Sequence, residues 1–403
     1  MSESTNIETR SAAPINLLTL ISLLAAIVAI TPLAIDLYLP AMLLIAKQLG
    51  TTMASVQNTL SIYLAGYALG LLLFGPLADM FGRRRLVMIG LTGFVVCCLL
   101  LPLQTSIEGF MALRAVQAFL GSAATVVVPG TIRQFYGKDT AKGMSYVSMI
   151  MMFAPMLAPT IGSFILVFGS WQWMFYLLAI YGIALIFFAA RYLPEMSSTT
   201  DAANFSQFLK NYYIVLGDKQ ARKNVASSML AAFAFFCYLT AIPSVYLDVY
   251  QTSEFLFSFL FALNVLALML AQFINTRLVG RRGSLWILKR AIILGIVFAA
   301  ALFTANWLYL PLLYTVLTLL PLMSCLSLIA VSADSLILIR FSEQTGTATA
   351  VIGTAKFGIG SLAGPILALF ATNTAVPFTL LMLLAVVFIA VIQLPSIARN
   401  ATG

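Results

Sequence analysis

Long apolar runs separated by short polar breaks make up most of the chain after residue 16. Most of these runs approach the ~20 residues that a helix needs to cross ~30 Å of hydrocarbon. None shows the strict alternation of a transmembrane β-strand, so the pattern predicts helices. The twelve predicted spans are Leu17–Leu39, Val56–Leu73, Leu86–Leu103, Phe110–Val128, Tyr146–Phe168, Trp173–Leu193, Val225–Tyr246, Phe255–Leu278, Ala291–Thr304, Tyr309–Val331, Thr349–Phe370 and Val376–Leu394.

A polar stretch between the sixth and seventh runs divides the chain into two halves of six spans. Within it, aromatic residues and leucines recur at helical spacing among lysines and arginines, which predicts an amphipathic helix on the membrane surface. The expected organisation is a tail (1–16), an N-terminal six-helix lobe (17–193), a linker (194–224), a C-terminal six-helix lobe (225–395) and a second tail (396–403).

The two halves repeat one feature at the same place. Gly82 is followed by three arginines after the second span, and Gly280 is followed by two after the eighth span. Aligned on these glycines, Arg277 of the second half stands where Asp79 stands in the first. Parallel repeats of six helices are typical of two-lobed transporters whose binding site lies between the lobes near the bilayer midplane.

Composition strengthens the membrane interpretation. The chain has 403 residues, of which 62% are hydrophobic and 9% charged, and its mean hydropathy is +1.02. One soluble core could not bury this much apolar surface. The first run contains Asp36 and no obvious cleavage site, so we expect it to remain as the first helix. The predicted fold class is an all-α integral membrane protein of twelve transmembrane helices in two pseudo-symmetric six-helix lobes.

The charge distribution predicts the topology. With a cytoplasmic N-terminus, the inner loops hold nearly all lysines and arginines, and the outer loops hold essentially Lys47. This asymmetry predicts a multi-pass protein of the bacterial inner membrane with both termini in the cytoplasm. It also accounts for the net charge of +9, so nucleic acid is not expected as a partner.

No catalytic residue, metal site or cofactor is expected. The sequence has no histidine, and its four cysteines lie inside apolar runs without CxxC spacing, which argues against zinc, haem and disulfides. A nucleotide-binding glycine loop and a cysteine nucleophile in a polar setting are also missing. The chain is therefore not expected to be an enzyme.

Asp36 is the first candidate functional residue. A charged side chain in the hydrocarbon costs on the order of 2.5–3.5 kcal/mol, so an acid inside a span indicates a functional site with a partner. Arg114 and Gln117 are spaced to share one face of the fourth span, with Arg114 ~9 Å in from Glu108. We placed Asp36 a few residues from the outer end of the first span, at a compatible depth. Asp36, Arg114 and Gln117 are the predicted proton-coupling site; a fixed structural ion pair is the alternative.

Lys356 is the second candidate. It lies ~15 Å along the eleventh span, which is too deep for its ammonium to reach the interface and requires protein or a water-filled cavity around it. Two roles stay open: binding an anionic group of the substrate, or pairing with Asp334 of the tenth span. If Lys356 faces the cavity, the substrate is anionic or zwitterionic rather than a lipophilic cation.

Aromatic and amide side chains near these charges are predicted to line an apolar cavity with a few polar groups. Each of them could instead be an ordinary packing residue. They are Tyr38, Asn58, Tyr63, Phe235, Phe236, Tyr238 and Asn264.

The segment from Gly75 to Arg85 resembles the loop signature of the major facilitator superfamily. The resemblance implies a latch that holds the inner ends of the lobes together in the outward-facing state. The residues that match it are Gly75, Asp79, Gly82, Arg83 and Arg84. With Arg277 in place of the acid, the second half is expected to lack a working latch.

Two further segments extend the resemblance. The residues from Leu113 to Gly121 resemble the RxxQG-type motif of the superfamily, and those around Pro155, Pro159 and Gly162 resemble its antiporter motif. Paired prolines and small residues kink a helix and allow close packing. The motif thus implies a hinge and a seal in the fifth span, in an exporter rather than an importer.

The run from Asp36 to Ala41 and the Ala-Pro pairs of the fifth span resemble the bicyclomycin/chloramphenicol-resistance (Bcr/CflA) subfamily of drug:proton antiporters. The resemblance covers nearly the whole chain. Lys356 departs from the subfamily, where an uncharged polar residue is expected. The resemblance implies a monomeric, proton-coupled exporter whose partners are protons, lipid and a small organic molecule: a drug, an anionic or zwitterionic metabolite, or a siderophore-like compound. The alternative is a proton-coupled importer of an organic acid or nutrient.

Overall fold

The computed structural model describes residues 17–194, 213–214, 217–341, 345–370 and 374–398. Every regular element in these ranges is a helix. Twelve segments of this described part are long and apolar enough to cross a membrane, which confirms the predicted all-α fold and the number of spans. The two predicted tails and most of the predicted amphipathic linker helix lie outside the described residues.

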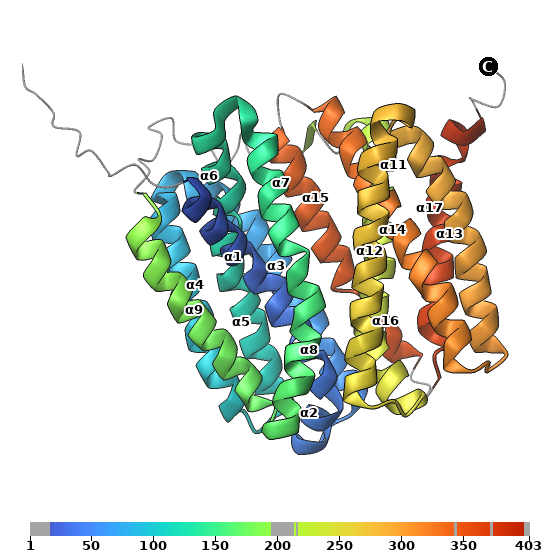
Figure 1. Ribbon diagram of the computed structural model, residues 1–403, viewed down its shortest axis with the longest axis horizontal. Helices are drawn as coiled ribbons and strands as arrows, with labels where there is room; N and C mark the ends of the chain where they lie inside the picture. Colours follow the sequence, from blue (N-terminus) through green and yellow to red (C-terminus); the bar gives the residue numbers. More distant parts are fainter. Residues whose placement is uncertain (1–16, 195–212, 215–216, 342–344, 371–373, 399–403) are drawn as a thin grey trace, which may run out of the picture.

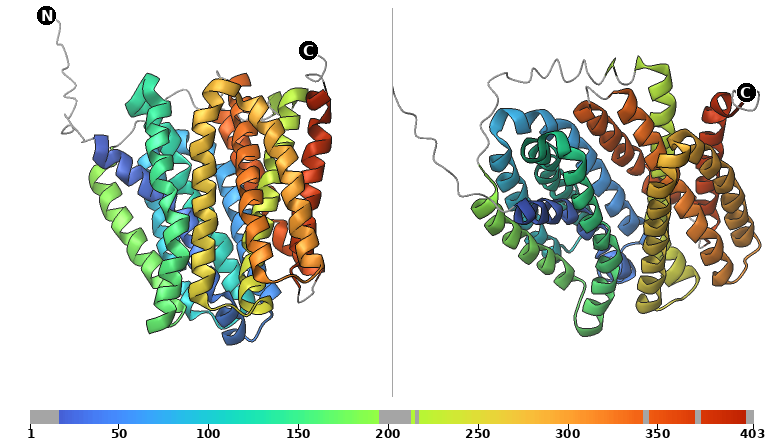
Figure 2. Two further views of the ribbon diagram at one scale, coloured as in Figure 1. Left: turned by 45° about the vertical axis from the view of Figure 1, so that its right-hand side comes forward. Right: turned by 45° about the horizontal axis from the view of Figure 1, so that its top comes forward.

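The helices form two bundles that lie side by side (Figure 1). The first consists of α1 (Leu17–Asp36), η1 (Leu39–Ala41), α2 (Met42–Gln48), α3 (Met53–Phe81), α4 (Arg83–Leu100), η2 (Leu101–Leu103), α5 (Ile107–Thr125), α6 (Val127–Tyr136), η3 (Gly137–Asp139), α7 (Thr140–Met151), α8 (Phe153–Phe168) and α9 (Gln172–Tyr192). The second consists of α11 (Lys219–Ser244), the π-helical turn η4 (Val245–Val249), α12 (Glu254–Arg282), α13 (Ser284–Trp307), α14 (Leu312–Arg340), α15 (Thr345–Gly360), α16 (Ala363–Leu369) and α17 (Val376–Ala398). The beginning of α1 and the end of α17 lie at the same end of the molecule (Figure 2).

Prolines explain where two spans break. Pro40 has no N–H to donate to the carbonyl of Asp36, so α1 ends at Asp36 and the chain continues through η1 into α2. The first span therefore runs to Gln48, and the predicted end at Leu39 is wrong. In the fifth span, Pro155 cannot bond the carbonyl of Met151, and α7 ends at that residue.

A glycine with positive φ joins two antiparallel helices in each bundle. Gly82, with φ of 86°, lies between α3 and α4, and Gly283, with φ of 76°, lies between α12 and α13. Glycine adopts this backbone region without a steric penalty. These two glycines are therefore equivalent, which corrects the sequence alignment of Gly82 with Gly280: Gly280, not Arg277, corresponds to Asp79.

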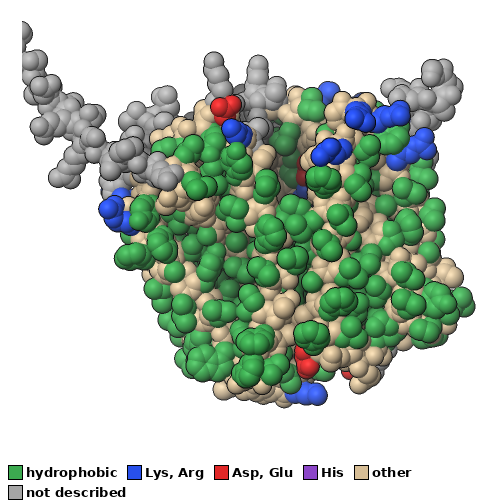
Figure 3. Space-filling view, in the orientation of Figure 1, with side chains coloured by type: hydrophobic (Ala, Val, Ile, Leu, Met, Phe, Trp, Pro, Cys, Tyr) green, Lys and Arg blue, Asp and Glu red, His purple; other side chains and the backbone are tan. Residues whose placement is uncertain are grey.

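One end of the molecule, called here the basic end, carries most of the described lysines and arginines (Figure 3). They include Arg83, Arg84, Arg85, Arg133, Lys219, Arg222, Lys223, Arg281, Arg282 and Arg340. Lys47, Glu108 and Glu254 lie at the opposite end, where α2 ends and α5 and α12 begin.

The two bundles pack on each other unevenly. The extensive contacts join α3 with α15 and α16, and α8 with α12. Within the described ranges, α7, the half of the fifth span nearer the basic end, has no comparable contact with the second bundle. A hollow between the bundles therefore opens at the basic end, and an acidic and a basic side chain are visible inside it (Figure 3).

Candidate functional site

Arg114 of α5 is completely buried, with 0% of its surface exposed. Its guanidinium carbon lies 4.5 Å from the ring centre of Tyr38 and 4.3 Å from that of Tyr63. Nη1 donates a hydrogen bond of 2.7 Å to Oε1 of Gln117, while Nε and Nη2 have no hydrogen-bond partner in the described part of the chain. Two aromatic rings and one amide therefore stabilise this cation.

A second set of hydrogen bonds holds this arrangement in place. Gln117 donates through Nε2 to Sγ of Cys98 at 3.0 Å. The hydroxyls of Tyr38 and Thr59 are 3.0 Å apart, and Thr59 donates to the carbonyl of Val56 at 2.6 Å. Tyr38, predicted to contact substrate, is thus fixed inside the first bundle against Arg114.

Asp36 is the last residue of α1 and is 4% exposed. Because α2 extends the first span to Gln48, Asp36 lies up to about 18 Å from the end of the span at 1.5 Å per residue, deeper than the sequence indicated. The expected ion pair with Arg114 is not present in this conformation, in which Arg114 contacts the two tyrosine rings and Gln117. Among the described residues, Asp36 has no hydrogen bond or ion pair through its side chain.

Two buried polar groups of the second bundle lack partners in the described part of the chain. The ring of Tyr238 of α11 stacks on that of Phe261 with centres 6.2 Å apart. The hydroxyl of Tyr238 and Oδ1 of Asn264 are buried and have no hydrogen-bond partner among the described residues. Oδ1 of Asn58, in the first bundle, is likewise buried and without a hydrogen-bond partner among the described residues.

An aromatic cluster connects the two bundles. The rings of Tyr67 and Phe357 are 4.6 Å apart between their centres, Phe357 and Phe236 are 5.7 Å apart, and Phe236 and Phe235 are 5.4 Å apart. Phe235 and Phe236 are among the residues predicted from the sequence, whereas Tyr67 and Phe357 are not. The position of Phe357 directly after Lys356 was the available signal.

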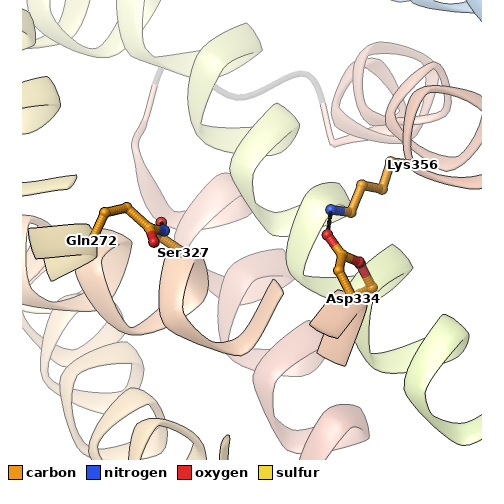
Figure 4. Close-up of polar contacts among 5 residues, drawn as sticks. Gln272, Ser327, Asp334 and Lys356 are labelled. Atoms are coloured by element: carbon orange, nitrogen blue, oxygen red, sulfur yellow. Dashed lines mark hydrogen bonds and ion pairs between the residues drawn. The ribbon is translucent and has the colours of Figure 1, made fainter. Parts of the chain in front are cut away.

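Lys356 of α15 forms an ion pair with Oδ2 of Asp334 of α14 (Figure 4). Ser228 of α11 donates a hydrogen bond of 2.6 Å to Oδ1 of the same carboxylate. The side chains of Lys356 and Asp334 remain 23% and 19% exposed. The ion pair, one of the two roles that the sequence left open for Lys356, is therefore present in this conformation. Both of its side chains are partly accessible to solvent.

Three serines close the gap between the bundles away from the basic end. Ser163 and Ser258 have their hydroxyl oxygens 2.6 Å apart. Ser163 also reaches the carbonyl of Glu254 at 2.8 Å, and Ser258 reaches that of Pro159 at 2.9 Å. Ser61 accepts a hydrogen bond of 2.8 Å from the N–H of Gly364. We call Ser61, Ser163 and Ser258 the serine seal.

Gly162 brings the fifth span against the break in the first. A methyl group at this position would lie 2.1 Å from the carbonyl oxygen of Leu37 and 3.1 Å from the ring of Pro40. Pro159 and Gly162 are both buried in α8. The predicted motif residues therefore hold α8 against the turn that follows Asp36.

A disulfide across the serine seal is expected to stop transport. In the double variant S163C/S258C, oxidation should join α8 to α12, because the native hydroxyl oxygens already approach to 2.6 Å. We expect loss of nearly all transport in proteoliposomes after oxidation and recovery after dithiothreitol. The two single variants, oxidised in parallel, should keep their activity; equal transport by the oxidised double variant would contradict a moving seal.

Two of the predicted latch residues, Arg83 and Arg84, contact their own bundle. Arg84 donates through Nη2 to the carbonyl of Ala190 at 2.5 Å. The guanidinium of Arg83 lies so close to Gly130 of α6 that a methyl group there would be 2.7 Å from its carbon. Gly75 is half-buried in α3, and the side chain of Asp79 is outside the described part of the structure.

No group of three or more His, Cys, Asp or Glu side chains able to hold a metal ion occurs in the described residues.

Two bundles of membrane-crossing helices, a hollow between them and buried charges in each bundle define a membrane transporter. The model of the Major Facilitator Superfamily matches residues 24–365, and the chain belongs to this family.

Relatives and a solved structure agree with this assignment. A bicyclomycin resistance protein homolog of Haemophilus influenzae is 29% identical over 359 residues, 86% of this chain and 88% of the relative. A chloramphenicol resistance protein of Pseudomonas aeruginosa is 30% identical over 286 residues, 69% of this chain and 65% of the relative. The xylose transporter XylE from E. coli, in a partially occluded inward open conformation, has a TM-score of 0.70 at 14% identity, covering 94% of this chain and 97% of its own. The resemblance to the bicyclomycin and chloramphenicol resistance proteins is confirmed.

Proposed function

We propose that this chain is a proton-coupled antiporter that exports a small organic molecule across the bacterial inner membrane. The observation that carries the proposal is Asp36, a carboxylate buried at a helix break and without a partner among the described residues. A carboxylate held this way can gain and lose a proton as its surroundings change. The names of the relatives, which include bicyclomycin and chloramphenicol resistance proteins, support export of a drug-like compound.

The proposed cycle begins from the conformation described here. With the basic end in the cytoplasm, the hollow admits substrate from inside while the serine seal closes the outer side. Asp36 gives its proton to the cytoplasm, substrate then binds, the bundles rock about α8 and the seal opens outward. Substrate leaves, Asp36 takes a proton from outside, and the hollow reopens. Arg114 and Gln117 act by setting the electrostatic potential around Asp36.

The substrate is proposed to bind in the hollow between the aromatic cluster and the charged groups. Phe235, Phe236 and Phe357 provide apolar surface, and the unpartnered polar atoms of Asn58, Tyr238 and Asn264 provide hydrogen bonds. An apolar pocket with a few polar groups accepts varied small molecules. Lys356 adds a positive charge at its edge.

Proton exchange in everted membrane vesicles tests the proposal. Chloramphenicol is the probe, because one relative is a chloramphenicol resistance protein and another is a homolog of a bicyclomycin resistance protein. In vesicles acidified inside, added chloramphenicol should release protons from the lumen at a rate that depends on the chain. Vesicles without the protein are the control, and a proton gradient unaffected by a panel of drug-like and carboxylate compounds would contradict antiport.

The second candidate function is proton-coupled import of an organic acid or nutrient. The Lys356–Asp334 pair favours it, because a lysine beside an accessible hollow suits a carboxylate substrate. The direction of proton movement relative to substrate movement separates the two functions. An importer would carry labelled substrate and protons the same way across the membrane, whereas the proposed exporter carries them in opposite directions.

A further inference from the structure

The charged pair of the second bundle has a geometry that suits exchange of partners. Lys356 has three N–H donors, and one of its contacts is Oδ2 of Asp334. The other oxygen of Asp334 is already hydrogen-bonded by Ser228. Both charged side chains are partly exposed, at 23% and 19%. An anion in the hollow can therefore reach the ammonium without first unpacking a helix.

We propose that Lys356 and Asp334 form an exchangeable pair in which an aromatic carboxylate takes the place of Asp334 on Lys356 while Asp334 takes up a proton. This inference rests on the proposed function and adds to it a substrate class and a second protonation site. The balance is simple: the Lys356–Asp334 contact breaks, a Lys356–carboxylate contact forms, and one proton from water converts the Asp334 carboxylate to the acid. Substrate anion and proton enter together, so the charge of the site is conserved.

Charge conservation is the physical reason for the proton. Taking Lys356 away from Asp334, whose side chain is only 19% exposed, would leave a poorly solvated carboxylate without a compensating charge, which is unfavourable. Ser228 can remain hydrogen-bonded to Asp334 in either protonation state, because a hydroxyl donates or accepts. Asp334 thus has a neutral form that keeps one of its two contacts.

Two polar contacts of α12 and α13 with this part of α14 join uncharged side chains. Gln272 of α12 donates to Ser327 at 2.5 Å, and Ser284 of α13 lies 3.2 Å from Ser335. In the described ranges, Lys289 of α13 forms no ion pair. Among these neighbours, Lys356 is therefore the cation that compensates Asp334.

The aromatic cluster selects the substrate class. Phe357 follows Lys356 on α15, and its ring contacts Phe236 of the same bundle and Tyr67 of the other. A carboxylate bound to Lys356 would place its organic part beside these rings. Ring–ring contacts of this kind add to the free energy gained by burial, so an aromatic carboxylate fits better than acetate or an inorganic anion.

Calorimetry on the full chain in lipid nanodiscs tests the exchange. Benzoate is the probe, and benzyl alcohol is its uncharged counterpart. Titration in two buffers with different ionisation enthalpies gives the number of protons taken up, which should be about one per benzoate in the wild type. No gradient is present, so failure here leaves the antiport assay of chloramphenicol unaffected and the two proposals can fail separately.

Three variants give separate results. Lys356→Gln should weaken benzoate binding at least about tenfold, and Asp334→Asn should bind benzoate without proton uptake. The double variant K356Q/D334N leaves no lone charge and should fold even if a single variant does not. It should bind benzyl alcohol as the wild type does, but neither bind benzoate nor take up a proton.

The matched control is Asp218→Asn, which removes the carboxylate of a different ion pair of this bundle. Asp218 accepts a 2.6 Å hydrogen bond from Arg340, and this contact lowers the pKa of its carboxyl. It lies before α11, outside the spans, so benzoate affinity and proton uptake should not change. The proposal is overturned if the double variant binds benzoate like the wild type, or if wild-type binding takes up no proton.

Discussion

Asp36→Asn is expected to reduce proton release from acidified everted vesicles by at least about tenfold, because the amide cannot carry a proton. The variant keeps the size of the side chain at a site that is 4% exposed and has no ion pair in the described part of the chain. Removing a buried, unpartnered charge should leave the fold intact or stabilise it. Chloramphenicol binding should therefore survive while coupling is lost.

Two controls separate this result from a general defect. Asp218→Asn makes the same chemical change outside the spans and should retain wild-type proton release. Asp36→Glu restores a titratable group and should recover part of it. Proton release by Asp36→Asn at the wild-type rate would remove Asp36 from the coupling mechanism.

Gly162→Ala is expected to cost about 1–3 kcal/mol of stability, the usual range for an overpacked site, and to slow transport at least about tenfold. The new methyl group would lie 2.1 Å from the backbone oxygen of Leu37. Since backbone cannot rotate away as a flexible side chain does, α8 must move from the turn that follows Asp36. The change therefore reaches both the hinge and the proton site.

Gly358→Ala is the matched control for this prediction. Gly358 lies in α15, and nothing lies within 4 Å of a methyl group placed there. It should be neutral or slightly stabilising, because alanine favours the helix. Thermal unfolding in detergent and initial rates in proteoliposomes measure both effects. Equal stability of the two variants would show that the contact between Gly162 and Leu37 relaxes at little cost.

The spans could be predicted from the sequence because apolar length is a strong signal, whereas their ends could not. The first span was ended at Leu39, but it resumes after the turn that Pro40 imposes and reaches Gln48. The tenth was ended at Val331, before Asp334, although α14 continues to Arg340.

The residues of the site could be predicted from the sequence better than the contacts between them. Asp36 and Lys356 stand out because a charge in hydrocarbon is costly, and the same argument applies to Asp334. The partner of Arg114 could not be deduced, because aromatic rings compete with a carboxylate for the cation and their placement depends on how the helices pack. The serine seal carries no signal in the sequence, since serines are common in helices and unremarkable singly.

The serine seal is made of neutral hydrogen bonds rather than ion pairs. Such bonds contribute about 0.5–1.5 kcal/mol each, so the group adds only a few kcal/mol to the closure of the end opposite the basic end. A ligand that binds the open form more tightly than the closed form by this much free energy shifts the population from mostly closed to mostly open. Because no net charge is involved, this closure should be nearly independent of ionic strength, and in the proposed orientation high salt outside the cell would leave it in place.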